Sequence, residues 1–143
     1  MDGSGRARLL VRAAALWLVP LAACGGAASN SSGGVRAAAR ASVDVPGADR
    51  FAPFIIAVAR GSEVTFHNAD SDTHTVVSVP GDDAALDLTL APGQTLTVTL
   101  HSAGVHRYFC SIHAHYDPAT GQVAANADAD HPNEPMQGVL VVT

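Results

Sequence analysis

The chain has 143 residues, a length that excludes a two-domain enzyme of ordinary size, and 48% of them are hydrophobic and 15% charged, a composition that excludes a disordered protein. Its thirteen acidic residues outnumber eight basic residues, all of them arginine, and the formal net charge is −5. An acidic chain without a basic cluster is not expected to bind nucleic acid through phosphate contacts.

Residues 1–23 have the pattern of an export signal. Three arginines near the start precede an apolar run from Ala13 to Ala23, which is interrupted only by Pro20. This run is too short for a membrane-spanning helix, which needs about 20 residues. It ends in Leu-Ala-Ala-Cys, which resembles a bacterial lipoprotein box, so Cys24 is expected to become the lipidated first residue of the mature chain. The alternative is an ordinary secretory signal that happens to be followed by a cysteine.

A short linker and an acidic domain follow the signal. Residues 24–36 contain the run Gly-Gly-Ala-Ala-Ser-Asn-Ser-Ser-Gly-Gly, which predicts a flexible tether. Residues 24–143 carry five arginines and twelve acids, a formal charge of −7. With Cys24 lipidated, Cys110 is the single thiol of the mature chain, and a lone thiol in an oxidising compartment needs a functional explanation.

The segment from residue 37 to residue 143 is expected to be a single all-β domain. Apolar and polar residues alternate along it, as Val64 and Phe66 do with Thr65, which is typical of strands that bury one face. Turn residues separate the predicted strands, which lie at 54–58, 62–68, 73–79, 86–90, 95–100, 105–110 and 138–143. About seven or eight short strands at this spacing predict a two-sheet antiparallel β-sandwich.

One segment interrupts this pattern just before the last strand. Residues 114–135 contain three prolines and show little periodicity, so we predict a long loop insertion there. Loops longer than about 12–15 residues are usually either functional or disordered. The insertion follows Cys110, which makes it relevant to any site built around that thiol.

Four residues with metal-binding side chains lie at the ends of predicted strands. His74 begins a strand, Cys110 ends one, His113 follows at Cys-x-x-His spacing, and Met136 directly precedes the last strand. A thiolate, two imidazoles and a thioether form a soft ligand set, which suits copper in a trigonal plane with a weak axial methionine. Zinc would want a fourth strong ligand, and hard cations would want oxygen. A buried cysteine that merely packs would not explain this coincidence.

Short motifs occur in a fixed order from residue 51 to the C-terminus. They are Phe51-Ala-Pro53-Phe54, Gly61-x-x-Val64-x-Phe66-x-Asn68-x-Asp70, His74-Thr-Val, Pro92-Gly-Gln, Ala103-Gly104-x-x-x-Tyr108-x-Cys110-x-x-His113 and Met136-x-Gly138-x-Val-x-Val. Together they resemble the cupredoxins, the type 1 blue copper proteins, in their plastocyanin-like branch. The resemblance implies a Greek-key β-sandwich with one copper ion that cycles between Cu(I) and Cu(II).

The resemblance also implies a role for each ligand. His74 corresponds to the ligand from the body of the sandwich, whereas Cys110, His113 and Met136 correspond to ligands at one end of it. An electron would then pass through an exposed histidine edge to redox partner proteins. The chain departs from the family in one respect, because 22 residues separate His113 from Met136 where the family has only a few. Some branches use Cys-x-x-x-x-His spacing, so His115 is an alternate ligand.

Other polar residues near the motifs have expected supporting or structural roles. Asn68, Thr75 and Ser111 are candidates for hydrogen bonds around the ligands, chosen from their positions alone. The remaining histidines are expected to be surface or packing residues: His67, His101, His106 and His131.

We therefore expect a monomeric electron-transfer protein, held by its lipid anchor at the extracytoplasmic face of the cell membrane or in the periplasm. Copper storage or delivery at the same location is the alternative, since the same ligands could serve it. An enzyme is not expected, because copper oxidases and nitrite reductases need a further copper site and the chain offers one His-x-His pair, His113 and His115. A two-copper centre would need two cysteines in one loop, where only Cys110 is available.

Overall fold

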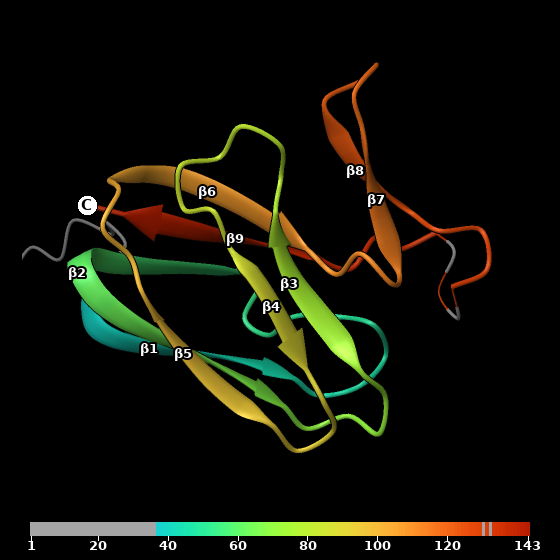
Figure 1. Cartoon of the computed structure of the whole chain (residues 1–143), viewed down its shortest axis with the longest axis horizontal. Coiled ribbons are helices and arrows are strands. Elements are labelled where there is room, and N and C mark those ends of the chain that lie inside the picture. Colours follow the sequence, from blue (N-terminus) through green and yellow to red (C-terminus); the bar gives the residue numbers. More distant parts are fainter. Residues whose placement is uncertain (1–36, 130, 132) are drawn as a thin grey trace, which may run out of the picture. The chain divides into compact units, whose positions relative to one another are not determined.

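The computed structural model describes residues 37–129, 131 and 133–143, which form nine strands. The predicted signal, Cys24 and the tether up to residue 36 lie outside the described residues. The strands are β1 (Ala38–Val45), β2 (Ile55–Asn68), β3 (His74–Ser78), β4 (Asp87–Leu90), β5 (Thr95–Thr99), β6 (Gly104–Phe109), β7 (Ala114–Asp117), β8 (Gln122–Ala125) and β9 (Gln137–Val142) (Figure 1). The described part of the chain contains no helical segment with the length and hydropathy of a membrane span.

Strand β2 joins the two layers of a β-sandwich. Its first half pairs with β9, which continues through β6 and β3 to β4, whereas its second half pairs with β5. Strand β1 runs alongside β2, and their register shifts between Ala38 and Arg40. Gly61 lies between the two halves with φ at +83°, a left-handed conformation that glycine adopts without a steric cost. The irregularity lets one long strand belong to both layers.

The all-β sandwich agrees with the sequence-based expectation, but the strand pairing is mixed rather than purely antiparallel. The β1–β2 and β2–β9 pairs are parallel, and the other pairs are antiparallel. Strands β1 and β2 are parallel because the connection 46–54 carries the chain back before β2 begins. The predicted strands at 54–58 and 62–68 are one strand, and β1 was not predicted.

The core lies between the layers and is built from the inward-facing residues of the alternating strands. Fully buried members from both layers include Val43, Val45, Val58, Val64, Phe66, Val76, Leu90 and Leu140. Burial of each such side chain stabilises the fold by about 1.5–3 kcal/mol. The Tyr108 ring packs edge-on against Phe51 and Phe66, with ring centroids 4.9 and 5.5 Å away. A Cβ on Gly138 would collide with this ring, so the strand beside it needs a glycine.

The segment predicted as a plain loop, 114–135, contains the antiparallel hairpin β7–β8. Buried side chains of the hairpin, Ala114 and Val123, form a small second core with Phe109. The Arg107 guanidinium also donates a hydrogen bond to the Gly121 carbonyl oxygen at 2.9 Å. The expectation of a long loop without strands is corrected here, because part of the insertion forms a hairpin that packs on Phe109 of β6.

Candidate metal centre

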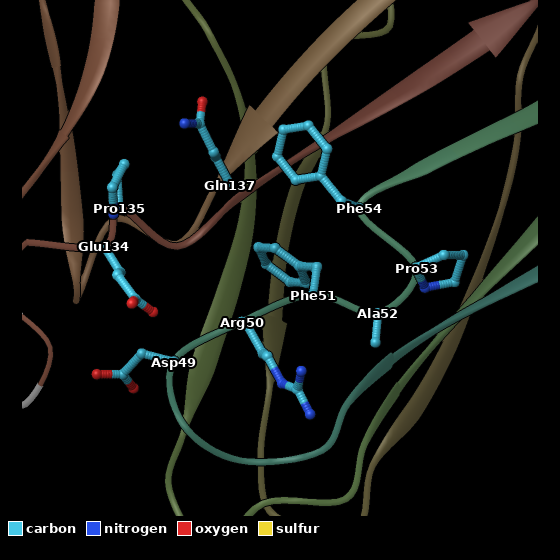
Figure 2. Close-up of a pocket in the computed structure, with 9 residues that line it drawn as sticks. All are labelled: Asp49, Arg50, Phe51, Ala52, Pro53, Phe54, Glu134, Pro135 and Gln137. Carbon is cyan, nitrogen blue, oxygen red and sulfur yellow. The ribbon is translucent and has the colours of Figure 1, made fainter.

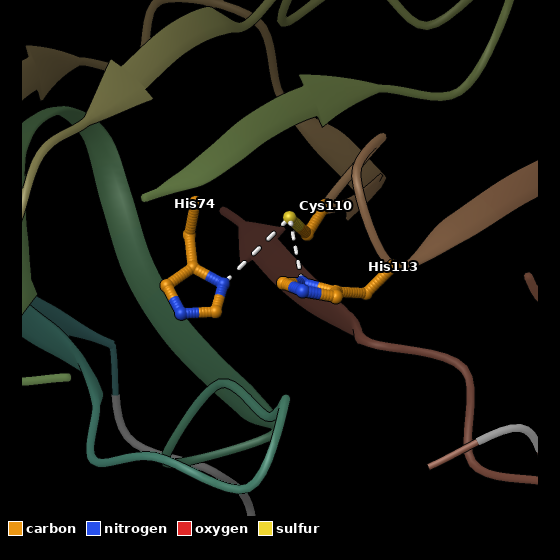
Figure 3. A group of neighbouring side chains, drawn as sticks. All are labelled: His74, Cys110 and His113. Atoms are coloured by element: carbon orange, nitrogen blue, oxygen red, sulfur yellow. Dashed lines mark hydrogen bonds between the residues drawn. The ribbon is translucent and has the colours of Figure 1, made fainter. Parts of the chain in front are cut away.

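Three of the predicted ligands meet at one end of the sandwich. The Cys110 Sγ lies 3.8 Å from the His74 Nδ1 and 3.5 Å from the His113 Nδ1. All three ligand atoms lie within 4.8 Å of one another. Figure 3 shows both imidazole rings turned so that Nδ1 faces the sulfur. His74 and Cys110 are fully buried, whereas the side chain of His113 is 15% exposed.

The turn after β6 explains how His113 reaches the thiol. The Cys110 carbonyl oxygen accepts hydrogen bonds from the backbone N–H groups of His113 at 3.2 Å and Ala114 at 2.9 Å. These bonds close one tight turn directly after the strand, which folds the chain back over Cys110. The insertion is tied to the same turn, because the Asn126 backbone N–H donates to the His113 carbonyl oxygen at 2.9 Å.

His74 is held from its far side by a carboxylate. The His74 Nε2 lies 3.0 Å from the Asp70 Oδ2, and this hydrogen bond is the main reason the pKa of Asp70 is lowered. The Asp70 backbone N–H in turn donates to the Asn68 Oδ1 at 3.0 Å. The buried Asn68 side chain donates to the carbonyl oxygens of Asp72 and Leu90, as expected for a supporting residue. This chain of bonds fixes the ring with Nδ1 toward the sulfur.

The surroundings of Cys110 favour the thiolate, the form that binds metals. Burial raises the pKa of the thiol, but hydrogen bonds from His74 and from the backbone N–H groups of Thr75 and Ile112 outweigh burial and lower it to about 6. The Thr75 N–H lies 3.3 Å from the Sγ. The Thr75 hydroxyl also lies 3.0 Å from the Ser111 hydroxyl and accepts from the Ser111 N–H at 2.7 Å. Thr75 and Ser111 therefore support the sulfur, as their positions in the sequence suggested.

The contact between His74 and Cys110 also affects the pKa of His74. Burial disfavours the charged imidazolium, but hydrogen bonds with Cys110 and Asp70 outweigh it, and the pKa of His74 is raised. A metal ion would displace the proton from Nδ1, because that nitrogen is the atom facing the sulfur.

His115, the alternate ligand, lies outside this cluster. It is on β7, where Ala114 faces inward and His115 is exposed. Its Nδ1 lies 2.9 Å from the Asn126 Oδ1. Another histidine, His106, is buried away from the ligands as expected, with its ring nitrogens 2.8 Å from the Asp82 Oδ1 and 2.9 Å from the Ser102 carbonyl oxygen.

Met136 returns to Cys110 after the long insertion. The Cys110 backbone N–H donates to the Met136 carbonyl oxygen at 3.0 Å, directly before β9 begins. The Met136 side chain is 1% exposed and belongs to the same buried cluster as Cys110. The chain therefore returns to the cysteine after the insertion, and the methionine lies next to it.

The chain is similar in sequence to plastocyanins, although no family model matches it. It is 38% identical to plastocyanin from Sambucus nigra over 74 residues, which cover 44% of this chain and 75% of that protein. It is 37% identical to plastocyanin from Rumex obtusifolius over 78 residues, which cover 47% and 79% of the two chains. The chain is a cupredoxin.

Solved structures agree with this cupredoxin fold. An oxidised mutant of amicyanin matches with a TM-score of 0.53 and 23% identity, covering 76% of this chain and 86% of that one. A Cu-containing nitrite reductase from Thermus scotoductus matches with a TM-score of 0.51 and 18% identity, covering 73% of this chain but 22% of the enzyme. At these identities the likeness concerns the fold.

The donor set of the cupredoxin fits copper better than the other common metals. A buried thiolate and two imidazoles present three soft or borderline donors, and such sets suit copper. The donors already face one another, so their side chains need little rearrangement to enclose one ion. The hydrogen bond with Asp70 holds the His74 ring in place, and the hydrogen bond from the Thr75 N–H holds the Cys110 sulfur.

One residue near the ligands had no signal in the sequence. Asp49 is 9% exposed, and its Oδ1 lies 3.5 Å from the His113 Nδ1. The preceding turn is left-handed, with φ of +96° at Gly47, +57° at Ala48 and +46° at Asp49. Each non-glycine residue in this region costs on the order of 1–3 kcal/mol, and such strain is often found at functional sites. Asp49 also borders a hollow of about 370 Å³ together with Phe51, Glu134 and other residues (Figure 2).

Proposed function

We propose that this cupredoxin transfers single electrons through one copper ion held by Cys110, His74 and His113, with Met136 as a weak axial ligand. The main support for the proposal is the cluster of His74, Cys110 and His113, in which the Nδ1 atoms of both histidines face the Cys110 sulfur. When bound, copper supplies the one-electron couple between Cu(I) and Cu(II). The similarity to plastocyanins supports this assignment.

The chain's own residues would keep the site the same in both oxidation states. Asp70 holds His74 by its Nε2, the Thr75 N–H holds the sulfur, and the turn after β6 holds His113. His74 and Cys110 have no exposed surface, so water is kept from them. His113 is the ligand whose side chain reaches the surface, and its edge would pass the electron to a redox partner.

The test of this function is an optical and electrochemical measurement on the copper-loaded chain. We expect one copper per chain, an intense thiolate-to-copper band in the visible, and a reversible one-electron wave with fast electron self-exchange. A copper storage or delivery protein would bind the metal with the same ligands but exchange electrons slowly. A chain without the visible band would refute the proposal.

We propose that the protein is a carrier rather than an enzyme. Within residues 37–129, 131 and 133–143 there is one group of three or more His, Cys, Asp or Glu side chains that could bind a metal. Copper enzymes that reduce nitrite or oxygen need a second site where the substrate binds. The matched part of the nitrite reductase is 22% of its length, which corresponds to the shared fold alone. Copper stoichiometry above one per chain would contradict this.

We propose further that Cys24 is lipidated and anchors the protein at the extracytoplasmic membrane surface. The support is the Leu-Ala-Ala-Cys sequence after the arginine-rich, apolar start. Mass spectrometry of the membrane fraction should find a mature chain that begins at Cys24 and carries a diacylglycerol group. The Cys24→Ser variant should lose both the lipid and the membrane association. A soluble mature chain that begins elsewhere would contradict the anchor.

Replacement of Met136 by leucine should keep the visible band and raise the reduction potential. An axial thioether stabilises Cu(II) slightly more than no ligand does, so its removal favours Cu(I). We expect the ratio of the affinities for Cu(I) and Cu(II) to change on the order of tenfold, which raises the reduction potential by about 59 mV for one electron. Leucine fills a similar buried volume, which keeps the core intact. Voltammetry measures the shift, and a lowered potential would exclude Met136 as an axial ligand.

A further inference from the structure

The Asp49 carboxylate faces the metal side of the His113 ring. Its Oδ1 lies 3.5 Å from the Nδ1, the same nitrogen that lies 3.5 Å from the Cys110 sulfur. Its Oδ2 is buried and has no hydrogen-bond partner within the described residues. Figure 2 shows the neighbouring Arg50 side chain directed away from this carboxylate, and the described chain contains no ion pair between the two.

Copper binding would leave this carboxylate with even fewer partners. A metallated Nδ1 uses its lone pair for the metal and carries no proton, so His113 could not form an ion pair with the Asp49 Oδ1, which lies 3.5 Å from that nitrogen. A buried carboxylate is costly unless an opposite charge or a hydrogen-bond donor compensates it. The positive charge at the centre of the site is then the nearest available compensation.

The carboxylate lies beside the ligand group rather than within it. The group whose ligand atoms all lie within 4.8 Å of one another consists of His74, Cys110 and His113, without Asp49. The left-handed turn from Gly47 to Asp49 also lies beside Asp70, the residue that holds His74. A Cβ on Gly47 would lie 3.9 Å from the Asp70 carboxylate. The turn therefore runs next to Asp70, which supports His74, and holds the Asp49 charge close to His113.

We propose that Asp49 is the counter-charge of the copper site and lowers its reduction potential. This inference rests on the proposed function. Cu(II) with one thiolate and two neutral imidazoles carries a charge of +1, and Cu(I) in the same site carries none. Asp49 brings these totals to 0 and −1, so a buried negative charge disfavours the reduced state. In this scheme Asp49 acts on the metal through its negative charge and does not ligate it.

The test is the reduction potential of the copper-loaded Asp49→Asn variant. Asparagine has the same size and tolerates left-handed φ values, so the turn should fold. We expect the visible band to remain, because all ligands remain, and the potential to rise by at least about 59 mV, a tenfold change in the ratio of the Cu(I) and Cu(II) affinities. If Asp49→Asn does not fold, Asp49→Ser carries the same prediction.

Glu134→Gln is the matched control. Glu134 lines the same hollow and also carries one negative charge, but its side chain is exposed and its charge is screened by solvent. Its replacement should leave the potential and the band unchanged. A shift of equal size in both variants would mean that Asp49 contributes only to the general field of the acidic surface, and would overturn the proposal.

The remaining outcomes separate this inference from the function on which it rests. An unchanged potential in Asp49→Asn, with the band intact, would overturn the role of Asp49 and leave the copper carrier standing. Loss of the band in Asp49→Asn would make Asp49 a ligand and would also overturn the proposal. Absence of the band in the unmodified chain would refute the proposed function itself.

Discussion

Replacement of Cys110 by serine should abolish the visible band of the copper-loaded chain completely. The band requires electron density to move from a thiolate sulfur to Cu(II), and a serine hydroxyl cannot supply that transition. Serine also remains protonated at neutral pH, so the site loses its one anionic ligand. Absorption spectroscopy after copper titration measures the effect, and a coloured Cys110→Ser chain would refute the assigned site.

The fold of this variant should survive, which keeps the result interpretable. A serine hydroxyl is slightly smaller than the thiol and can accept the hydrogen bond that the Thr75 N–H now donates to the sulfur. Circular dichroism of the metal-free chain checks this point. Ser111→Ala is a suitable control, because Ser111 is exposed and adjacent to Cys110, its hydroxyl hydrogen-bonds to Thr75 rather than to the sulfur, and alanine keeps the backbone N–H that donates to Thr75. That variant should keep its colour.

The grouping of His74, Cys110 and His113 could be predicted because these residues lie at or just beyond the ends of strands with a clear pattern. His74 is the first residue of β3, and Cys110 directly follows β6. Strand ends at one edge of a sandwich lie near one another, so the residue types and spacing indicated that these side chains meet. The ligand role of each came from the resemblance to cupredoxins, and the sequence left His113 and His115 as alternatives. Asn68 and Thr75 could also be chosen, since they flank the ligands in the sequence.

Asp49 shows what the sequence pattern could not supply. Asp70 ends the motif that begins at Gly61, although its hydrogen bond with His74 was not predicted. Asp49 has no such signal, since a left-handed turn at Gly47–Asp49 aims it at His113, 64 positions further along the chain. Alternation of apolar and polar residues does not specify such backbone conformations.

Three strands were not predicted from the sequence, for a different physical reason. Strands β1 and β8 are rich in alanine, which provides little contrast between a buried and an exposed face, and β7 is only four residues long. Their conformation is decided by partners far away in the sequence. Strand β1 pairs along β2, and the hairpin packs on Phe109. Tertiary contacts of this kind outweigh local propensity in short strands.

Individual replacement of His113 and His115 by alanine should give opposite results. His113→Ala should lose the blue spectrum, because it removes an imidazole whose Nδ1 lies 3.5 Å from the Cys110 sulfur and opens the site to water. His115→Ala should keep the spectrum, because His115 is exposed and bonded to Asn126. Loss of that hydrogen bond should lower the free energy of unfolding by about 0.5–1.5 kcal/mol.

Rescue by free imidazole distinguishes a missing ligand from a disturbed fold. In His113→Gly the space left by the ring opens toward the surface, since the original side chain is 15% exposed there. Added imidazole should therefore enter, bind the copper and restore the band. The tight turn closed by the Ala114 N–H on the Cys110 carbonyl oxygen does not involve the ring and should persist in the variant. If His115→Ala bleaches the protein instead, or imidazole restores no colour to His113→Gly, the second equatorial nitrogen does not come from His113.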